Sequence, residues 1–165
     1  MRVLVADEDF AVRRAVSKVL RDAGYEVVLA RDSQETLGLV NSQQIDLVIL
    51  DLGLPIRDGW DVFEQMTTEA PVLPIIVITG LVNQRDLAVE AGLGALLEKP
   101  LDAPQLLQTM ETLLAESMAA RLNRLGRGGQ DLRPVPSSGT AMLRQLRARQ
   151  PAPPRRRITD QTGGS

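Results

Sequence analysis

Residues 46–59 read DLVILDLGLPIRDG, and this stretch decides the fold that the sequence predicts. Its first part is a short aliphatic run that is apolar on both faces, which is typical of a strand buried inside a sheet. The run ends at Asp51, and the glycine, proline and aspartate that follow are typical of a turn. The stretch therefore predicts a buried strand that carries a carboxylate at its carboxyl end.

Aliphatic runs of the same kind alternate with stretches of helical spacing on both sides of this segment. The predicted strands are RVLVA at 2–6, YEVVLA at 25–30, DLVIL at 46–50, PIIVIT at 74–79 and ALLEK at 95–99. The predicted helices are residues 11–24, 33–43, 58–70 and 83–92, with left-handed glycines at Gly24 and Gly92 and N-caps at Ser33, Asp58 and Asp102. Strict alternation of strand and helix predicts an α/β fold in which helices cover both faces of a parallel sheet.

The last third of the chain divides into a predicted helix and a tail. Residues 102–125 keep helical spacing, which predicts one long helix with Pro104 in its first turn. Its apolar positions drift off a strict heptad, which favours docking on the domain over a coiled-coil dimer. From Gly126 onward Pro, Gly, Ser and Arg dominate, which is typical of disorder. We therefore expect a folded domain over 1–120, with a final helix that can extend to 125, and a basic tail over 126–165.

Composition excludes several classes of function. The chain has no cysteine and no histidine, which removes disulfides, the commonest metal ligand and the commonest general base. No apolar stretch approaches the ~20 residues that cross a bilayer, so we expect a cytoplasmic protein with no membrane contact. Charge is divided along the chain: residues 1–120 hold 9 Lys and Arg against 19 Asp and Glu, whereas 121–165 hold 10 Arg against 2 Asp.

Polar side chains follow four of the predicted strands. The acidic residues Asp7, Glu8 and Asp9 follow the first strand, Asp51 the third, Thr79 the fourth and Lys99 the fifth. The carboxyl ends of parallel strands share one edge of the sheet, where ligands bind. Carboxylates gathered there favour a cation, and an oxygen-only set without histidine suits Mg²⁺. Asp7, Glu8 and Asp51 therefore predict a Mg²⁺ site. Thr79 and Lys99 are suited to bond the oxygens of a phosphoryl group on Asp51.

These motifs together resemble the response-regulator receiver domain of two-component signalling, from Arg2 to about Ala120. The matching motifs are the acidic pair at 7–8, DLGLPIRDG at 51–59, TG at 79–80 and KP at 99–100. The resemblance implies a flavodoxin-like three-layer α/β/α sandwich with a five-stranded parallel sheet of order 2-1-3-4-5. It implies that Asp51 is the phospho-acceptor, that Thr79 and Lys99 contact the phosphoryl group, and that Mg²⁺ is held by Asp7, Glu8, Asp51 and the carbonyl of Gly53.

The resemblance also implies a single-domain response regulator. Such a protein accepts its phosphoryl group from a sensor histidine kinase or a phosphotransfer protein and signals to a downstream effector protein by direct contact. Such a protein is expected not to be an enzyme; it catalyses only its own phosphorylation and autodephosphorylation. The sequence departs from the family at Leu96, where an aromatic residue is common, at Leu101, where Phe often follows the KP pair, and at Glu8, where many members have Asp.

Other interpretations remain open at this point. The acidic residues 7–9 could simply favour a helix dipole, and Asp51 with Lys99 could form a structural ion pair. The arginines at 155–157 could give the tail a weak nucleic-acid contact, although the sequence predicts no folded nucleic-acid-binding element beside them. A Mg²⁺-dependent phosphatase would place a second Asp two residues after the nucleophile, and Gly53 at that position argues against one.

Overall fold

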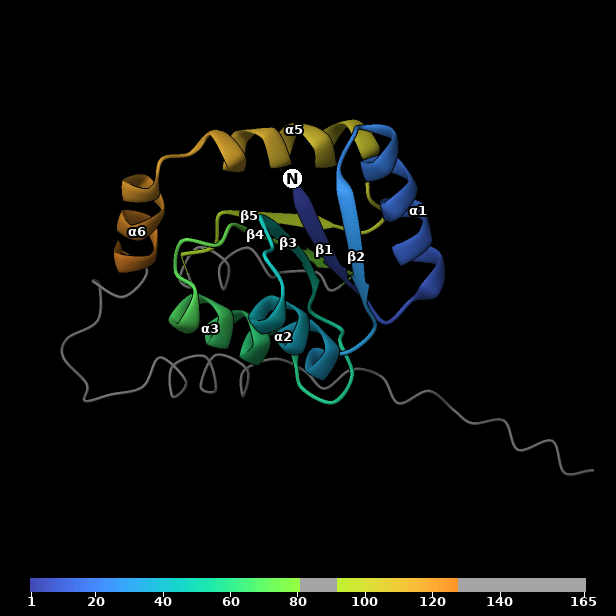
Figure 1. The fold of residues 1–165 in the computed structure, drawn as a ribbon, viewed down its shortest axis with the longest axis horizontal. Coiled ribbons are helices and arrows are strands. Elements are labelled where there is room, and N and C mark those ends of the chain that lie inside the picture. Colours follow the sequence, from blue (N-terminus) through green and yellow to red (C-terminus); the bar gives the residue numbers. More distant parts are fainter. Residues whose placement is uncertain (81–91, 128–165) are drawn as a thin grey trace, which may run out of the picture.

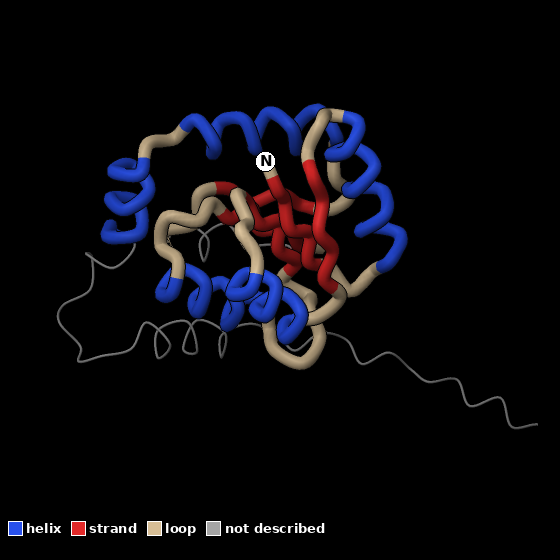
Figure 2. The backbone as a smooth tube through the Cα atoms, viewed as in Figure 1, coloured by secondary structure: helices blue, strands red, loops and turns tan. Residues whose placement is uncertain are grey.

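The computed structural model describes residues 1–80 and 92–127 of the chain. The predicted helix at 83–92, apart from Gly92, and the predicted tail beyond residue 127 lie outside the described residues. Within the described part, a parallel sheet lies between two layers of helices (Figures 1 and 2). This arrangement confirms the three-layer α/β/α prediction.

The sheet has the predicted strand order, β2-β1-β3-β4-β5, and every pairing is parallel. The strands are β1 (Arg2–Ala6), β2 (Glu26–Ala30), β3 (Leu47–Asp51), β4 (Ile75–Thr79) and β5 (Ala95–Glu98). The carboxyl ends of all five strands therefore lie at one edge. At that edge β1 and β3 are neighbours, although β2 separates them in the sequence, and ligands bind at such reversals of strand order.

Helices cover the two faces of the sheet in pairs. They are α1 (Phe10–Asp22), α2 (Ser33–Ser42), α3 (Gly59–Glu69), α5 (Ala103–Ala115) and α6 (Met118–Arg127). Figure 1 shows α1 and α5 on one face, α2 and α3 on the other, and α6 at one end of the sheet. Among the helices that the structure describes, none is both long enough and apolar enough to pass through a membrane.

Two aliphatic cores lie on opposite faces of the sheet. Successive strand residues point to opposite sides, so that Leu4 and Leu50 pack in the core beneath α2 and α3, whereas Val5 and Ile49 pack beneath α1 and α5. Trp60 lies in the first of these cores, and its ring meets that of Phe63 edge to face, with ring centres 5.8 Å apart. Burial of both faces of the central strands β1, β3 and β4 explains why these strands lack alternating polar residues.

Aspartates begin four of the five helices that the structure describes. The carboxylate of Asp58 accepts the Trp60 N–H, and that of Asp102 accepts the Gln105 N–H, as predicted. The prediction of Ser33 as an N-cap is wrong. Asp32 is the cap and accepts the Glu35 N–H at 2.8 Å, because a carboxylate one residue earlier reaches the first free amides of the helix. Gly24 and Gly92 have φ values of 87° and 68°, which confirms their predicted left-handed conformation.

The prediction of one helix over 102–125 is wrong, because the chain turns between α5 and α6. Glu116 has an extended conformation, with φ −66° and ψ 133°, and ends α5. The Ser117 hydroxyl accepts the Ala120 N–H at 3.2 Å and so caps α6. Helical spacing continues across the turn, which is why the pattern did not reveal it. Helix α6 docks on the domain and crosses the predicted boundary at residue 120.

Gly59 offers a test of how closely α3 approaches the strand that carries Asp51. A Cβ at Gly59 would lie 2.5 Å from the Leu52 Cα and 2.6 Å from the Asp51 carbonyl oxygen. We expect Gly59→Ala to lower the free energy of unfolding by about 1 to 3 kcal/mol, since backbone must move to accept the methyl group. Chemical denaturation measures this change.

Gly38→Ala is the matched control, because a Cβ there meets nothing within 4 Å and Gly38 lies inside α2. It should raise the free energy of unfolding by roughly 0.5 to 1 kcal/mol through helix propensity. Equal effects of the two substitutions would contradict the close packing at Gly59.

Candidate functional site

Three charged side chains meet at the carboxyl edge of the sheet. The Lys99 Nζ lies 2.7 Å from Asp7 Oδ2 and 3.2 Å from Asp51 Oδ2. Asp7 is fully buried, Asp51 is 4% exposed, and the Lys99 side chain is 24% exposed. One ammonium therefore bridges two carboxylates at a place where water reaches only the lysine readily.

Strand register brings these residues together from distant parts of the chain. Ala6 pairs with Leu50, which places Asp7 and Asp51 side by side where β1 and β3 end. Asp51 pairs with Ile78, and the Lys99 N–H donates to the Thr79 carbonyl at 2.8 Å. The backbone pairing thus brings the carboxyl ends of β1, β3, β4 and β5 side by side, as predicted.

Asp7 is held in place by several contacts. Its Oδ1 accepts the Asp9 N–H at 2.8 Å, and its carbonyl oxygen accepts a hydrogen bond from Arg13 Nη1 at 2.5 Å. Its Oδ2 is buried and, among the described residues, accepts no hydrogen bond in addition to the Lys99 ion pair. The sequence pattern missed the role of Arg13, since helical spacing alone places that residue on the polar face of α1.

The surroundings of Asp51 disfavour its charge. Burial raises the pKa of the Asp51 carboxyl, and the neighbouring Asp7 charge raises it further. The Lys99 ammonium and a hydrogen bond from the Gly53 backbone N–H lower it, but do not cancel the rise. The result is a carboxylate that is more basic than an ordinary aspartate, which favours its use as a nucleophile.

Lys99 keeps its charge in this setting. Burial alone would lower its pKa, but the hydrogen bond and charge of Asp7 together with the charge of Asp51 outweigh burial and raise the pKa. Two carboxylates and one ammonium leave one negative charge without a partner among them. Such a site favours a further cation, since buried charges are stable only when compensated.

Glu8 does not join the other two acids. It is exposed, and the described residues contain no group of three or more acidic or other metal-binding side chains placed around one point. Asp9 lies beside it and serves as the N-cap of α1, with Oδ1 accepting the Ala11 N–H at 2.7 Å. The helix-start interpretation therefore holds for Asp9, while Asp7 turns inward to the site.

Gly53 lies directly against the Asp51 carboxylate. Its N–H bonds Asp51, and a Cβ at this position would lie 3.1 Å from Asp51 Oδ2. A side chain at this position would therefore press against that oxygen. The predicted role of the Gly53 carbonyl in metal binding stays a prediction.

The remaining predicted positions surround this group. Thr79 is buried at the end of β4, one residue beyond the partner of Asp51. Leu96 is half-buried against the core beneath α2 and α3, and Leu101 against the core beneath α1 and α5. Two of the three departures from the family pattern, Leu96 and Leu101, therefore serve as aliphatic packing.

Comparison with known proteins identifies the family. The model of the response regulator receiver domain matches residues 3–111. The response regulator MprA of Mycobacterium bovis is 37% identical over 135 residues, which cover 76% of this chain and 59% of MprA. The chain thus spans about six-tenths of the length of that relative.

Solved structures agree with the match. The receiver domain of NtrX from Brucella abortus superposes with a TM-score of 0.65 at 31% identity and covers 70% of this chain and 99% of that one. The response regulator TrrA from Thermotoga maritima, solved in complex with Mg²⁺-BeF, gives 0.64 at 26% identity and covers 68% and 97%. The fold, the strand-end residues and these relatives agree, and the chain belongs to the response regulator receiver domain family.

Proposed function

We propose that this receiver domain accepts a phosphoryl group on Asp51 from a sensor histidine kinase or a phosphotransfer protein. The observation that carries the proposal is the bridge from the Lys99 ammonium to two buried carboxylates, Asp7 and Asp51, at the carboxyl edge of the sheet. A structural ion pair would need one carboxylate, whereas a phosphoryl site needs a nucleophile together with cationic support.

The chemistry follows from the positions of these side chains. An Asp51 oxygen forms a bond to phosphorus while the bond from phosphorus to the donor breaks, and the donor keeps that electron pair. The Lys99 ammonium offsets negative charge on the transferring group, because it already lies 3.2 Å from Asp51 Oδ2. Thr79 supplies a hydroxyl from the neighbouring strand end, and Gly53 places no side chain against the Asp51 oxygen that receives the incoming group.

The residues of the site fit a magnesium ion. Asp7 Oδ2 is buried and, within residues 1–80 and 92–127, accepts no hydrogen bond beyond its ion pair, and the three charged groups carry an excess of one negative charge. Asp7, Asp51 and the Gly53 carbonyl would hold the ion, with exposed Glu8 acting through water. When bound, Mg²⁺ supplies positive charge and orients the phosphoryl oxygens.

Phosphorylation would change the balance of charge that holds Lys99. The modification replaces the single charge of the Asp51 carboxylate with a phosphoryl group that carries roughly −1.5 to −2 charge, beside Asp7. Lys99 then has a stronger partner on Asp51 than either carboxylate offers in the unmodified site. A shift from mostly inactive to mostly active needs about 5.5 kcal/mol of differential interaction, which a redistribution of buried charges of this kind is able to provide.

We further infer that this domain acts in the cytoplasm on a downstream effector protein and catalyses no turnover beyond its own phosphorylation and dephosphorylation. The Mg²⁺-BeF complex of the similar protein TrrA supports the choice of cofactor. The residues of the alternative nucleic-acid contact, 155–157, lie outside the described structure, and no observation on the described residues favours that function.

Phosphoryl acceptance gives the first test of this function. Incubation with Mg²⁺ and acetyl phosphate should add one phosphoryl group to the wild type, read by intact mass, and none to Asp51→Ala. The exposed Asp22→Ala serves as the matched control and should be modified as the wild type is. Absence of the added mass in the wild type, or its presence in Asp51→Ala, would overturn the proposal.

Substitutions at the two ends of the charge bridge should change stability in opposite directions. In metal-free buffer, Lys99→Ala leaves two buried carboxylates uncompensated and should lower the free energy of unfolding on the order of 3 kcal/mol. Asp51→Asn leaves a neutral Lys99 and Asp7 pair and should raise it on the order of 1 kcal/mol. Lys18→Ala removes an exposed pair and should change it by less than ~0.5 kcal/mol.

The pH dependence of stability should distinguish the same variants. Because folding raises the pKa of Asp51, the stability that its protonated form contributes is present below the ordinary value of 3.8 and is lost as the pH rises through the raised pKa. Asp51→Asn should therefore gain most over the wild type at neutral pH and little in acid. Thermal denaturation across this range measures the difference, and a constant gap at every pH would contradict the account.

A further inference from the structure

Strand β5 is an edge strand of the described sheet and pairs with β4 alone. It is four residues long, and the Lys99 of the acceptor site follows it directly. An edge strand hydrogen-bonded on one side is the part of a sheet that shifts at the lowest cost. What holds the two ends of β5 therefore decides its position.

The carboxyl end is held by charge. Lys99 contacts Asp7 and Asp51 through its side chain and bonds the Thr79 carbonyl through its N–H. Any group that arrives on Asp51 changes the forces on this end of the strand.

The amino end is held by helix α6. The Arg124 Nε donates to the Gly92 carbonyl oxygen at 3.1 Å. A Cβ at Gly92 would lie 2.8 Å from the Arg124 carbonyl oxygen, and a Cβ at Gly94 would lie 2.8 Å from Arg124 Nη2 and from Leu113 Cδ2. We call Gly92 and Gly94 the seat of α6. The α6 backbone and the Arg124 side chain lie so close to these glycines that a Cβ on either would clash.

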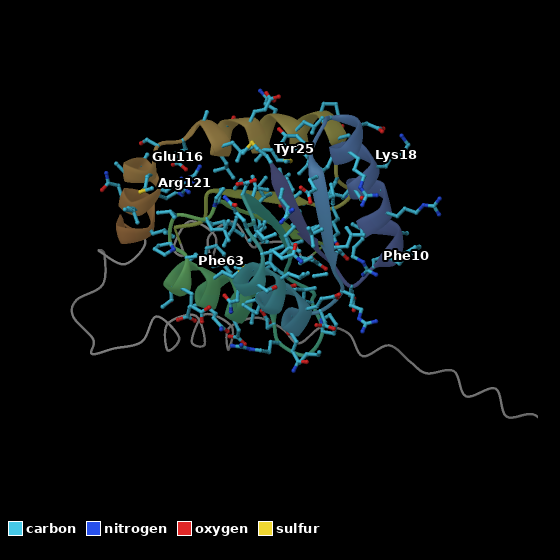
Figure 3. All side chains as sticks on the ribbon, viewed as in Figure 1. Phe10, Lys18, Tyr25, Phe63, Glu116 and Arg121 are labelled. Carbon is cyan, nitrogen blue, oxygen red and sulfur yellow. The ribbon has the colours of Figure 1, made fainter. Side chains whose placement is uncertain are left out.

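Helix α6 is anchored to the rest of the domain by a second arginine. Arg121 donates to the carbonyl oxygens of Val72, before β4, and of Leu113, in the last turn of α5. Glu116 in the turn pairs with both Arg121 and Arg124, and Figure 3 shows Glu116 and Arg121 close together where α5 leads into α6. Helix α6 is therefore bonded to the segments that lead into β4 and β5.

We propose that α6 is a latch, a helix whose docking holds the amino end of β5 in place, and that this docking is coupled to the state of the acceptor site. The inference rests on the proposed phosphorylation of Asp51. Because the seat at Gly92 and Gly94 is at closest approach, movement of β5 toward α6 is blocked and movement away loses the contacts. A phosphoryl group that draws Lys99 into a new position weakens the docking of α6, and by linkage the loss of docking changes the free energy of phosphoryl binding equally.

Hydrogen exchange on the full chain tests the coupling. Addition of Mg²⁺ and beryllofluoride, a phosphoryl analogue, should accelerate exchange of the α6 amides by ~5-fold or more, relative to those of α2. Asp51→Ala should show no such response. Lys99→Ala without any ligand should accelerate α6 relative to α2 in the same way, whereas the exposed Lys18→Ala should not.

A change at the seat gives the reciprocal test. Gly94→Ala should displace Arg124, accelerate α6 exchange without ligand and remove the further response to beryllofluoride. Gly126→Ala, the same chemical change on α6 itself with nothing within 4 Å, should leave the response intact.

The outcomes separate this inference from the function on which it rests. Addition of phosphoryl mass to Asp51 with unchanged α6 exchange would overturn the latch and leave the proposed function standing. Absence of phosphoryl mass would overturn both. Equal acceleration throughout the domain would show general destabilisation and would also overturn the latch.

Discussion

The contact of one ammonium with two buried carboxylates is the constraint on which the structure of the site depends. Asp7 and Asp51 end neighbouring strands at the point where strand order reverses, and parallel pairing leaves them no freedom to separate. Lys99 reaches both from β5 and keeps its charge because of them. One negative charge remains in excess, in a place largely closed to water. Burial and the charge of Asp7 together account for the raised pKa of Asp51. The excess of negative charge accounts for the affinity that we propose for a divalent cation and a phosphoryl group.

The same lysine links the site to the opposite edge of the domain. It follows β5, whose amino end lies against α6 through Gly92 and Arg124. The side chain of Leu96, in the middle of that strand, is half-buried against the core and has no ring to swing between positions. Movement of the strand as a body, read by the helix docked at its far end, is then the simplest means by which the state of Asp51 is communicated in this chain.

The sequence predicted the class of fold and most of the site, because both follow from short-range patterns. Aliphatic runs bounded by turn residues predicted all five strands, and polar residues at their ends predicted Asp7, Asp51, Thr79 and Lys99 as neighbours. The patterns could not show that Asp32 caps α2, since two adjacent residues, Asp32 and Ser33, both suit a cap. They could not show the turn at Glu116 either, because apolar spacing is the same in one bent helix and in two. Nor could they separate Glu8 from Asp7, whose different burial depends on the path of the chain between β1 and α1.

Direct titration of the Asp51 carboxyl by nuclear magnetic resonance tests the central interaction most directly. In metal-free buffer the pKa of this group should lie above its ordinary value of 3.8, because burial and Asp7 outweigh Lys99. Addition of Mg²⁺ should bring it down, since a cation at the site favours the charged form. An ordinary or lowered pKa without metal, or a pKa that Mg²⁺ leaves unchanged, would contradict the excess of negative charge on which the account depends.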